Sequence, residues 1–138
     1  MAQVYTRKGV QAGSAARTAL RVTAVLCTLE ILFQGATAGQ MITRVPGSLY
    51  LHAVGAIVFH VLSGLMLIAA ALLWRATRGS IWPTVISLLV FICGFVQAAL
   101  GDAGQLKGHV PLSLVLLIGT VWVLFWSFLS APGERRRA

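Results

Sequence analysis

Charged side chains are scarce in this sequence. Only 10% of its 138 residues are charged and three are acidic, whereas 58% are hydrophobic. A soluble domain carries charge on about a quarter of its residues, so this composition does not fit one. The sequence also lacks the strict alternation of polar and apolar residues that is typical of membrane β-strands. These absences leave a helical membrane protein.

Four long apolar runs are present, and few residues separate them. They cover residues 22–42, 49–74, 82–100 and 110–129. Each run is long enough to cross a hydrocarbon core of about 30 Å as a helix, and short connections make consecutive helices antiparallel. The sequence therefore predicts an all-α, up-down-up-down, four-helix transmembrane bundle over residues 21–131.

The segments at the ends of the predicted helices contain residues that indicate local structure. Residues 1–20 and 132–138 are basic, and we expect the first segment to be a mobile tail or a short surface helix. Pro46-Gly47 marks a turn, and Ser48 is expected to be the N-cap of the second helix. Pro111 fits the first turn of the fourth helix, where its missing N–H is not needed.

The positive charges indicate the orientation of the bundle. The net charge is +8, yet the connections that follow the first and third runs carry only Arg44 and Lys107 as basic residues. By the positive-inside rule, both termini are then cytoplasmic, and we expect a multi-pass protein of the bacterial inner (plasma) membrane. No basic stripe interleaved with aromatic residues supports binding to nucleic acid.

Cysteine is equally sparse. Cys27 and Cys93 each lie inside an apolar run, and no Cys-x-x-Cys motif is present. Small buried apolar side chains explain both residues. We expect no disulfide bond.

The sequence has three histidines, and two of them follow a weak internal repeat of two helices. Gln34 lies near the end of the first run and His52 opens the second; Gln97 and His109 are related in the same way in the other half. Because the second and fourth helices are parallel, the two histidines lie at one depth near the outer face. Two histidines from two helices of a bundle can ligate one heme iron.

This pattern leaves alternatives open. His52 and His109 are either axial ligands of heme b or interfacial histidines wetted by the outer headgroups. A small metal site with Asp102 as a third ligand is a further alternative.

The remaining polar residues inside the spans are candidates for contacts with a cofactor or quinone. A carboxylate facing lipid costs about 2.5 kcal/mol or more, so Glu30 is expected to face the bundle interior, protonated or paired. Gln34 lies one turn away from it, and Gln97 offers a matching amide for an interhelical hydrogen-bond set. The alternatives for these groups are hydrogen bonds that hold helices together and a proton relay.

His60 lies two turns deeper than His52, about 12 Å along the helix axis. It is therefore not expected to ligate the same iron. It can hydrogen-bond Glu30 or a heme propionate, or ligate a second cofactor. Ala56 and the third-helix glycines, Gly94 and Gly101, either let the helices pack closely, the commoner use of small residues, or leave space for a flat ring.

At these residues each half of the chain resembles a half-repeat of heme A synthase, which is built from two four-helix bundles. The resemblance covers about residues 20–130 and is carried by Gln34-Gly35, the stretch from Gln97 to Gly101, and the two helix-opening histidines. It implies that His52 and His109 are axial ligands on the outer side. The segment from Leu29 to Gln34 also resembles small, uncharacterised four-helix membrane proteins of bacteria.

The sequence departs from that enzyme family in ways that bear on activity. Leu49 stands three residues before His52, where the family has a catalytic glutamate, and the outer loops contain no cysteine pair. The resemblance therefore implies a heme-binding bundle and no oxidation of a heme methyl group.

The sequence thus favours an electron-transfer or redox subunit without catalytic activity of its own. One alternative is a cofactor-free accessory or assembly subunit of a larger membrane complex. Another is a small bundle that conducts protons or a solute through Glu30 and His60. The partners expected are the lipid bilayer and other membrane subunits or quinone.

The charge asymmetry makes the orientation testable. In a background without Cys27 and Cys93, a membrane-impermeant thiol reagent applied from outside is expected to label Arg44→Cys and Lys107→Cys. Arg78→Cys is expected to react only after the membrane is permeabilised. The reverse pattern would place both histidines at the cytoplasmic face.

Overall fold

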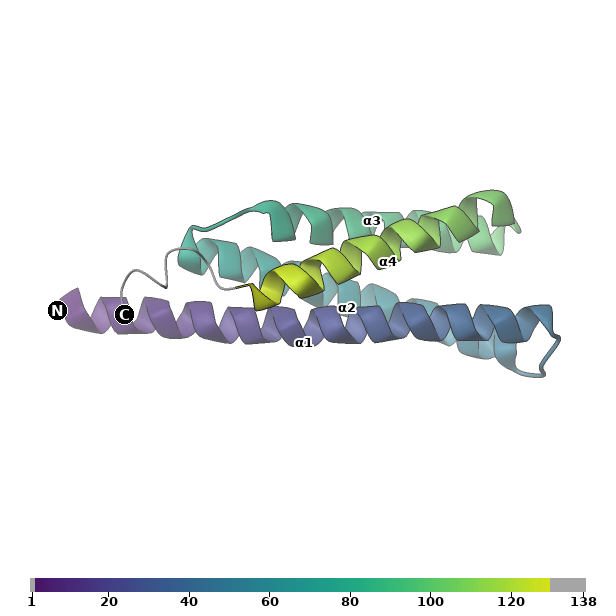
Figure 1. Ribbon diagram of the computed structural model, residues 1–138, viewed down its shortest axis with the longest axis horizontal. Helices are drawn as coiled ribbons and strands as arrows, with labels where there is room; N and C mark the ends of the chain where they lie inside the picture. Colours follow the sequence, from purple (N-terminus) through teal and green to yellow (C-terminus); the bar gives the residue numbers. More distant parts are fainter. Residues whose placement is uncertain (1, 130–138) are drawn as a thin grey trace.

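The computed structural model describes residues 2–129, with side chains from Gln11 onward. This part of the chain forms four helices and no strand: α1 (Ala2–Ile42), α2 (Ser48–Thr77), α3 (Trp82–Asp102) and α4 (Leu106–Phe128), as Figure 1 shows. All four contain a stretch that is long and apolar enough to cross a membrane. The predicted four-helix bundle is confirmed, and the chain is a multi-pass membrane protein.

The first helix is much longer than the predicted span. It begins at Ala2, so the segment predicted as a separate tail is, from that residue, part of one continuous helix. With 41 residues, α1 is about 60 Å long. Gly13 faces Thr77, the last residue of α2, so the residues before Gly13 extend beyond the bundle (Figure 1). The predicted C-terminal tail lies outside the described residues.

The α1–α2 turn differs from the prediction in its cap. Gly47, not Ser48, is the N-cap of α2, and its φ of 80° lies in the left-handed region that glycine adopts without strain. Ser48 is the first helical residue, and its hydroxyl donates to the carbonyl of Val45 at 2.7 Å. The predicted N-cap is wrong because the Pro-Gly pair completes the turn one residue earlier.

The fourth helix begins earlier than predicted. Gly104 closes the α3–α4 connection with a φ of 67°, and α4 starts at Leu106. Pro111 is therefore inside the helix, not in its first turn, and it removes the hydrogen bond that residue 111 would donate to the carbonyl of Lys107. Because of this earlier start, His109 is also further inside α4 than predicted. Its backbone N–H donates to the carbonyl of Gln105 at 3.0 Å.

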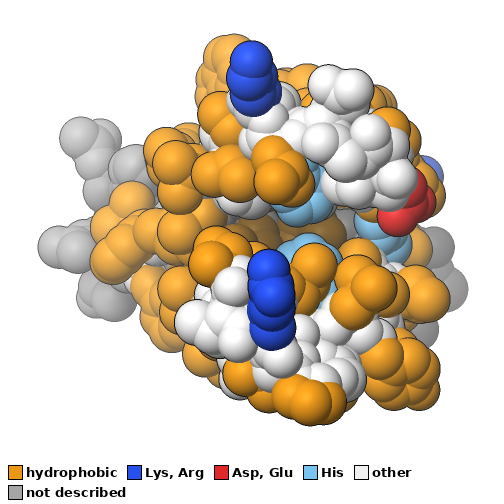
Figure 2. Space-filling model, turned by 90° about the vertical axis from the view of Figure 1, so that its right-hand side faces the viewer, with side chains coloured by type: hydrophobic (Ala, Val, Ile, Leu, Met, Phe, Trp, Pro, Cys, Tyr) orange, Lys and Arg blue, Asp and Glu red, His pale blue; other side chains and the backbone are white. Residues whose placement is uncertain are grey.

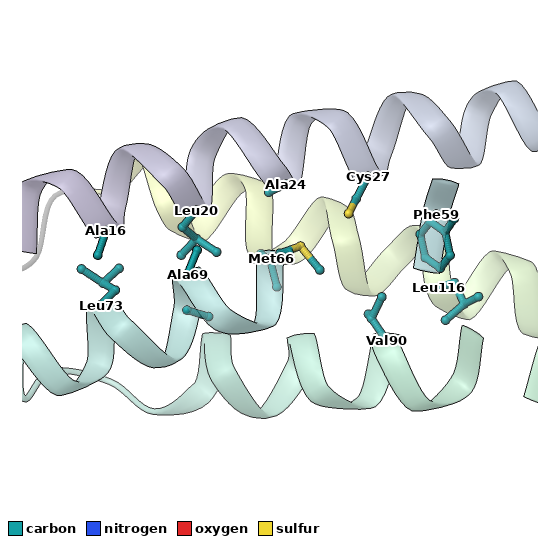
Figure 3. Packing of buried hydrophobic residues seen from close by; sticks show 12 residues of the cluster. Ala16, Leu20, Ala24, Cys27, Phe59, Met66, Ala69, Leu73, Val90 and Leu116 are labelled. Atoms are coloured by element: carbon teal, nitrogen blue, oxygen red, sulfur yellow. The ribbon is translucent and has the colours of Figure 1, made fainter. Parts of the chain in front are cut away.

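The four helices pack in a ring. Each of α1 and α3 contacts both α2 and α4, whereas in the described chain no Cα atoms of α2 and α4 lie within 8 Å of each other. Figure 3 shows the centre of the bundle, which small or flexible apolar side chains fill. Leu20, Cys27, Met66 and Val123 are fully buried there. Both cysteines are free, as predicted.

Two arginines of α1 cap the C-terminal end of α4. Arg21 Nε donates to the carbonyl of Ser127 at 2.9 Å, and its guanidinium lies 4.9 Å from the ring centre of Phe128. Arg17 Nη1 donates to the carbonyl of Leu129 at 3.3 Å. The last carbonyls of a helix have no partner within it and form the negative end of its dipole. These cations therefore tie α4 to α1.

Replacing Arg21 tests this cap. Arg21→Met keeps the apolar stem but loses the charged donor, and we expect a loss of about 1–2 kcal/mol in the free energy of unfolding, measured in detergent micelles. Arg17→Met is the matched control, because its bond is longer and exposed; a change within about 0.5 kcal/mol is expected. Equal effects for the two variants would contradict a specific role for Arg21.

Candidate functional site

The two outer histidines meet across the bundle. His52 is in the second turn of α2, and His109 is the fourth residue of α4. Although α2 and α4 are diagonal neighbours with no close backbone contact, the two imidazole ring centres are 6.1 Å apart and the ring planes are inclined by 54°. Both side chains are half-buried. The structure thus brings together the two histidines that the sequence places at one depth.

The His52 ring is held by α1. Its Nδ1 lies 2.9 Å from the hydroxyl of Thr37, a fully buried residue. That hydroxyl donates its own hydrogen to the carbonyls of Phe33 and Gln34 at 3.2 and 3.0 Å. With that hydrogen directed to a carbonyl, the hydroxyl oxygen accepts from His52, which in this tautomer carries its proton on Nδ1 and keeps a lone pair on Nε2.

The His109 ring is held by α3 in a similar way. Its Nδ1 lies 2.8 Å from the carbonyl oxygen of Gln97, which can only accept, so Nδ1 carries the proton. The side-chain amide of Gln97 lies 3.4 Å from Nε2 of the same ring. A Cβ on Gly101 would come within 2.8 Å of the His109 ring, so the ring needs a glycine at this position.

The internal repeat therefore extends to hydrogen bonds. In each half, the histidine Nδ1 is tied to a glutamine carbonyl of the preceding helix, directly at Gln97 and through Thr37 at Gln34. Sequence reasoning missed Thr37, although it lies three residues after Gln34 and so on the same helix face. It also expected the glutamine side chains, and not their backbone carbonyls, to make the principal contacts.

Glu30 and Gln34 form a pair at the α1–α2 interface. Gln34 Nε2 donates to Glu30 Oε1 at 3.0 Å, and both groups press against Gly55 of α2, where a Cβ would overlap them. Glu30 thus faces a neighbouring helix, as expected. The expected set joining Gln34 to Gln97 is absent from the described hydrogen bonds, because each glutamine is used within its own half.

His60 belongs to a different interface. Its Nδ1 donates to the carbonyl of Ala56 at 2.6 Å, and its ring lies 4.2 Å from that of Phe95 on α3. A Cβ on Gly94 would lie 3.5 Å from its Nε2. The expected bond to Glu30 is not formed, because Glu30 approaches α2 from α1. Of the two uses expected for Gly94 and Gly101, the structure has close packing and not space for a flat ring, since His60 and His109 lie against them.

The site lies at the end of the bundle that carries the α1–α2 and α3–α4 connections, the end expected to face outward. Figure 2 looks onto this end and shows histidine side chains in a hollow between the two halves, with a Lys or Arg side chain on either side. The α1–α2 connection contributes Arg44, and the first turn of α4 contributes Lys107. Among the described residues, no group of three or more His, Cys, Asp or Glu side chains is placed to hold a metal ion. The three-ligand site with Asp102 is therefore not formed.

No protein-family model, curated protein or solved structure matches this chain. The resemblance to heme A synthase accordingly stays a prediction.

The setting of Glu30 gives a direct test. Glu30→Gln retains an oxygen that can accept from Gln34, so we expect its free energy of unfolding to stay within about 0.5 kcal/mol of the wild type. Glu30→Lys puts a cation against Gln34 and Gly55 inside the span and is expected to destabilise the protein by about 2.5 kcal/mol or more. Unfolding in mixed micelles measures both. A fully stable Glu30→Lys protein would show that the side chain reaches water.

Proposed function

We propose that this chain is an integral membrane protein that binds one heme b between His52 and His109 and acts as an electron-transfer subunit. One observation carries the proposal. Two imidazole rings from diagonal helices lie with their centres 6.1 Å apart and their planes inclined by 54°. The two helices have no Cα atoms within 8 Å of each other, so backbone packing between them does not bring the rings together.

The separation fits bis-histidine ligation. Two imidazoles on opposite sides of one metal ion, with metal–nitrogen bonds of about 2 Å, need ring centres roughly 6 Å apart. The Gln97 carbonyl fixes the proton of His109 on Nδ1, and Thr37 engages Nδ1 of His52. Each Nε2 can then give a lone pair to a metal, which at His109 would replace the 3.4 Å contact with the Gln97 amide. Hydrogen bonds to the non-ligating nitrogen typically fix the orientation and tautomer of ligating histidines. Thr37 and the Gln97 carbonyl supply these bonds.

The charges at this end favour heme over a bare metal ion. Heme b carries two propionates, which are anionic at neutral pH. Arg44 and Lys107 are the basic residues of the two outer turns, and this end carries a Lys or Arg side chain on either side of the hollow (Figure 2). Cations of this kind make charge-assisted hydrogen bonds to carboxylates. This end of the bundle therefore offers both nitrogen ligands for the iron and cations for the propionates.

The ligand set also points to the type of activity. When bound, heme supplies reversible one-electron chemistry. With a histidine on each side of the iron, no axial position remains for a substrate or oxygen, which favours electron transfer over catalysis. The residues around the site then hold the two imidazole rings, fix which nitrogen of each ring carries the proton, and exclude lipid.

A spectrum of the purified protein, expressed with ample heme, tests the proposal. We expect sharp α and Soret bands of a low-spin bis-histidine heme after reduction with dithionite. His52→Ala and His109→Ala are each expected to abolish this spectrum or convert it to a high-spin one. His60→Ala is the matched control and should leave the axial ligation intact, because His60 lies on the α2–α3 side.

Two outcomes would overturn the proposal. A colourless wild-type protein under these conditions would favour the cofactor-free accessory subunit. A low-spin spectrum that survives both outer-histidine substitutions would assign the heme to other residues.

A further inference from the structure

We infer that the turn between α2 and α3 binds the headgroup phosphate of an anionic phospholipid through Arg75 and Arg78. This turn lies at the end of the bundle away from the outer histidine pair (Figure 1). The site is therefore separate from the proposed heme and does not depend on it. Two observations point to it: the backbone conformation of Arg78, and the lack of a partner for either guanidinium among the described residues.

Arg78 occupies a backbone position that favours glycine. It follows the last residue of α2 with a φ of 52°, in the left-handed region, and its N–H donates to the carbonyl of Trp74 at 2.8 Å. Many helices end on a glycine in this conformation, because a residue with a side chain is strained there. The next residue is a glycine, yet the left-handed position itself holds the arginine. Strain of this kind is typically kept where the residue has a function.

Two simpler explanations for a basic residue in this turn do not account for the strain. A cation near the C-terminus of α2 complements the helix dipole, but Arg75 in the last turn already supplies one. The positive-inside rule requires basic residues in the connection and not at one particular backbone position. An arginine in the left-handed position therefore indicates a specific contact of its side chain.

The protein offers these two side chains no anion. The arginines of α1 at this end donate to carbonyls of α4. In contrast, Arg75 and Arg78 are exposed, and neither guanidinium has a hydrogen bond or an ion pair with a described residue. The described acidic residues lie elsewhere, since Glu30 presses against Gly55 inside the bundle and Asp102 ends α3 at the opposite end. The anion that the two arginines bind must then come from outside the described chain.

The surroundings of the turn select a lipid phosphate. Trp82, which opens α3, is 61% exposed, as tryptophans at the headgroup level are. Ser80 Oγ accepts from the N–H of Trp82 at 3.3 Å, so its hydroxyl hydrogen is available to a further acceptor. Guanidinium groups bind phosphate oxygens in pairs. An anionic phospholipid supplies a phosphate at this level and acyl chains for the exposed apolar side chains of both helices, whereas a soluble phosphate ester supplies only the first.

Native mass spectrometry of the heme-free full chain in detergent tests binding directly. The probe is phosphatidylglycerol, and the matched probe is phosphatidylcholine, in which a choline cation offsets the phosphate charge. Glycerol 3-phosphate serves as the soluble headgroup. We expect phosphatidylglycerol to bind saturably, and both other compounds to bind at least about tenfold more weakly.

Arg78→Gly separates binding from folding. Glycine adopts a φ of 52° without strain, so the Tm in phosphatidylcholine nanodiscs should be at or above that of the wild type. Binding of phosphatidylglycerol should still weaken at least about tenfold, because a charged donor is lost. Arg44→Gly is the matched control. It removes an arginine with a similar φ of 58° from the opposite end and should leave this binding unchanged.

Each contrary result would overturn the site. These results are equal binding of phosphatidylcholine and phosphatidylglycerol, equal binding of glycerol 3-phosphate, and full affinity in Arg78→Gly. A lower Tm of Arg78→Gly would show that the arginine serves the helix end itself. Equal losses of affinity in Arg78→Gly and Arg44→Gly would indicate diffuse attraction between basic residues and anionic lipid. Because the protein is heme-free, none of these outcomes bears on the proposed electron-transfer function.

Discussion

The rest of the structure depends on the absence of hydrogen-bond partners in lipid. Every polar atom within the spans must find its partner inside the bundle. Most side chains meet this demand locally: the buried hydroxyls of Ser63, Thr120 and Ser127 donate to carbonyls of their own helices. Larger groups do so across the helix pair, as the Thr37 hydroxyl does for His52 and the Gln97 carbonyl does for His109. An imidazole nitrogen left over in such a setting is therefore informative.

The same constraint sets the chemistry of all three histidines. Nδ1 of His60 and of His109 is engaged by a helix carbonyl, and Nδ1 of His52 by the Thr37 hydroxyl. Nε2 is therefore the ring nitrogen left to accept. Two of these rings, from His52 and His109, lie with their centres 6.1 Å apart, an arrangement suited to a metal held between them.

Hydropathy and loop length predicted the four helices, their antiparallel order and the meeting of His52 with His109, because these features depend on helix length and direction alone. The sequence did not reveal which helices are diagonal, since that depends on side-chain packing around the ring. Thr37 was missed because a threonine in a span usually bonds only to its own helix. The roles of Gly94 and Gly101 stayed open between close packing and space for a ligand, because a glycine equally accommodates a neighbouring side chain or a ligand. Pro111 was placed in a first turn because the hydrophobic run, and not the Gly104 turn, was taken as the start of the helix.

The two ends of the bundle differ in the hydrogen bonds that connect the α1–α2 pair to the α3–α4 pair. At the end where α4 terminates, Arg21 and Arg17 tie its last turn to α1. At the outer end, the described hydrogen bonds of His109 connect α4 only to α3, and those of His52 connect α2 only to α1. The two helical hairpins thus lack a hydrogen-bonded link at the end where their histidines meet. A group ligated by both rings would supply this diagonal link, and because it would bind only the folded bundle, it would also stabilise that bundle by mass action. The site therefore lies where a cofactor adds a connection that the chain alone does not make.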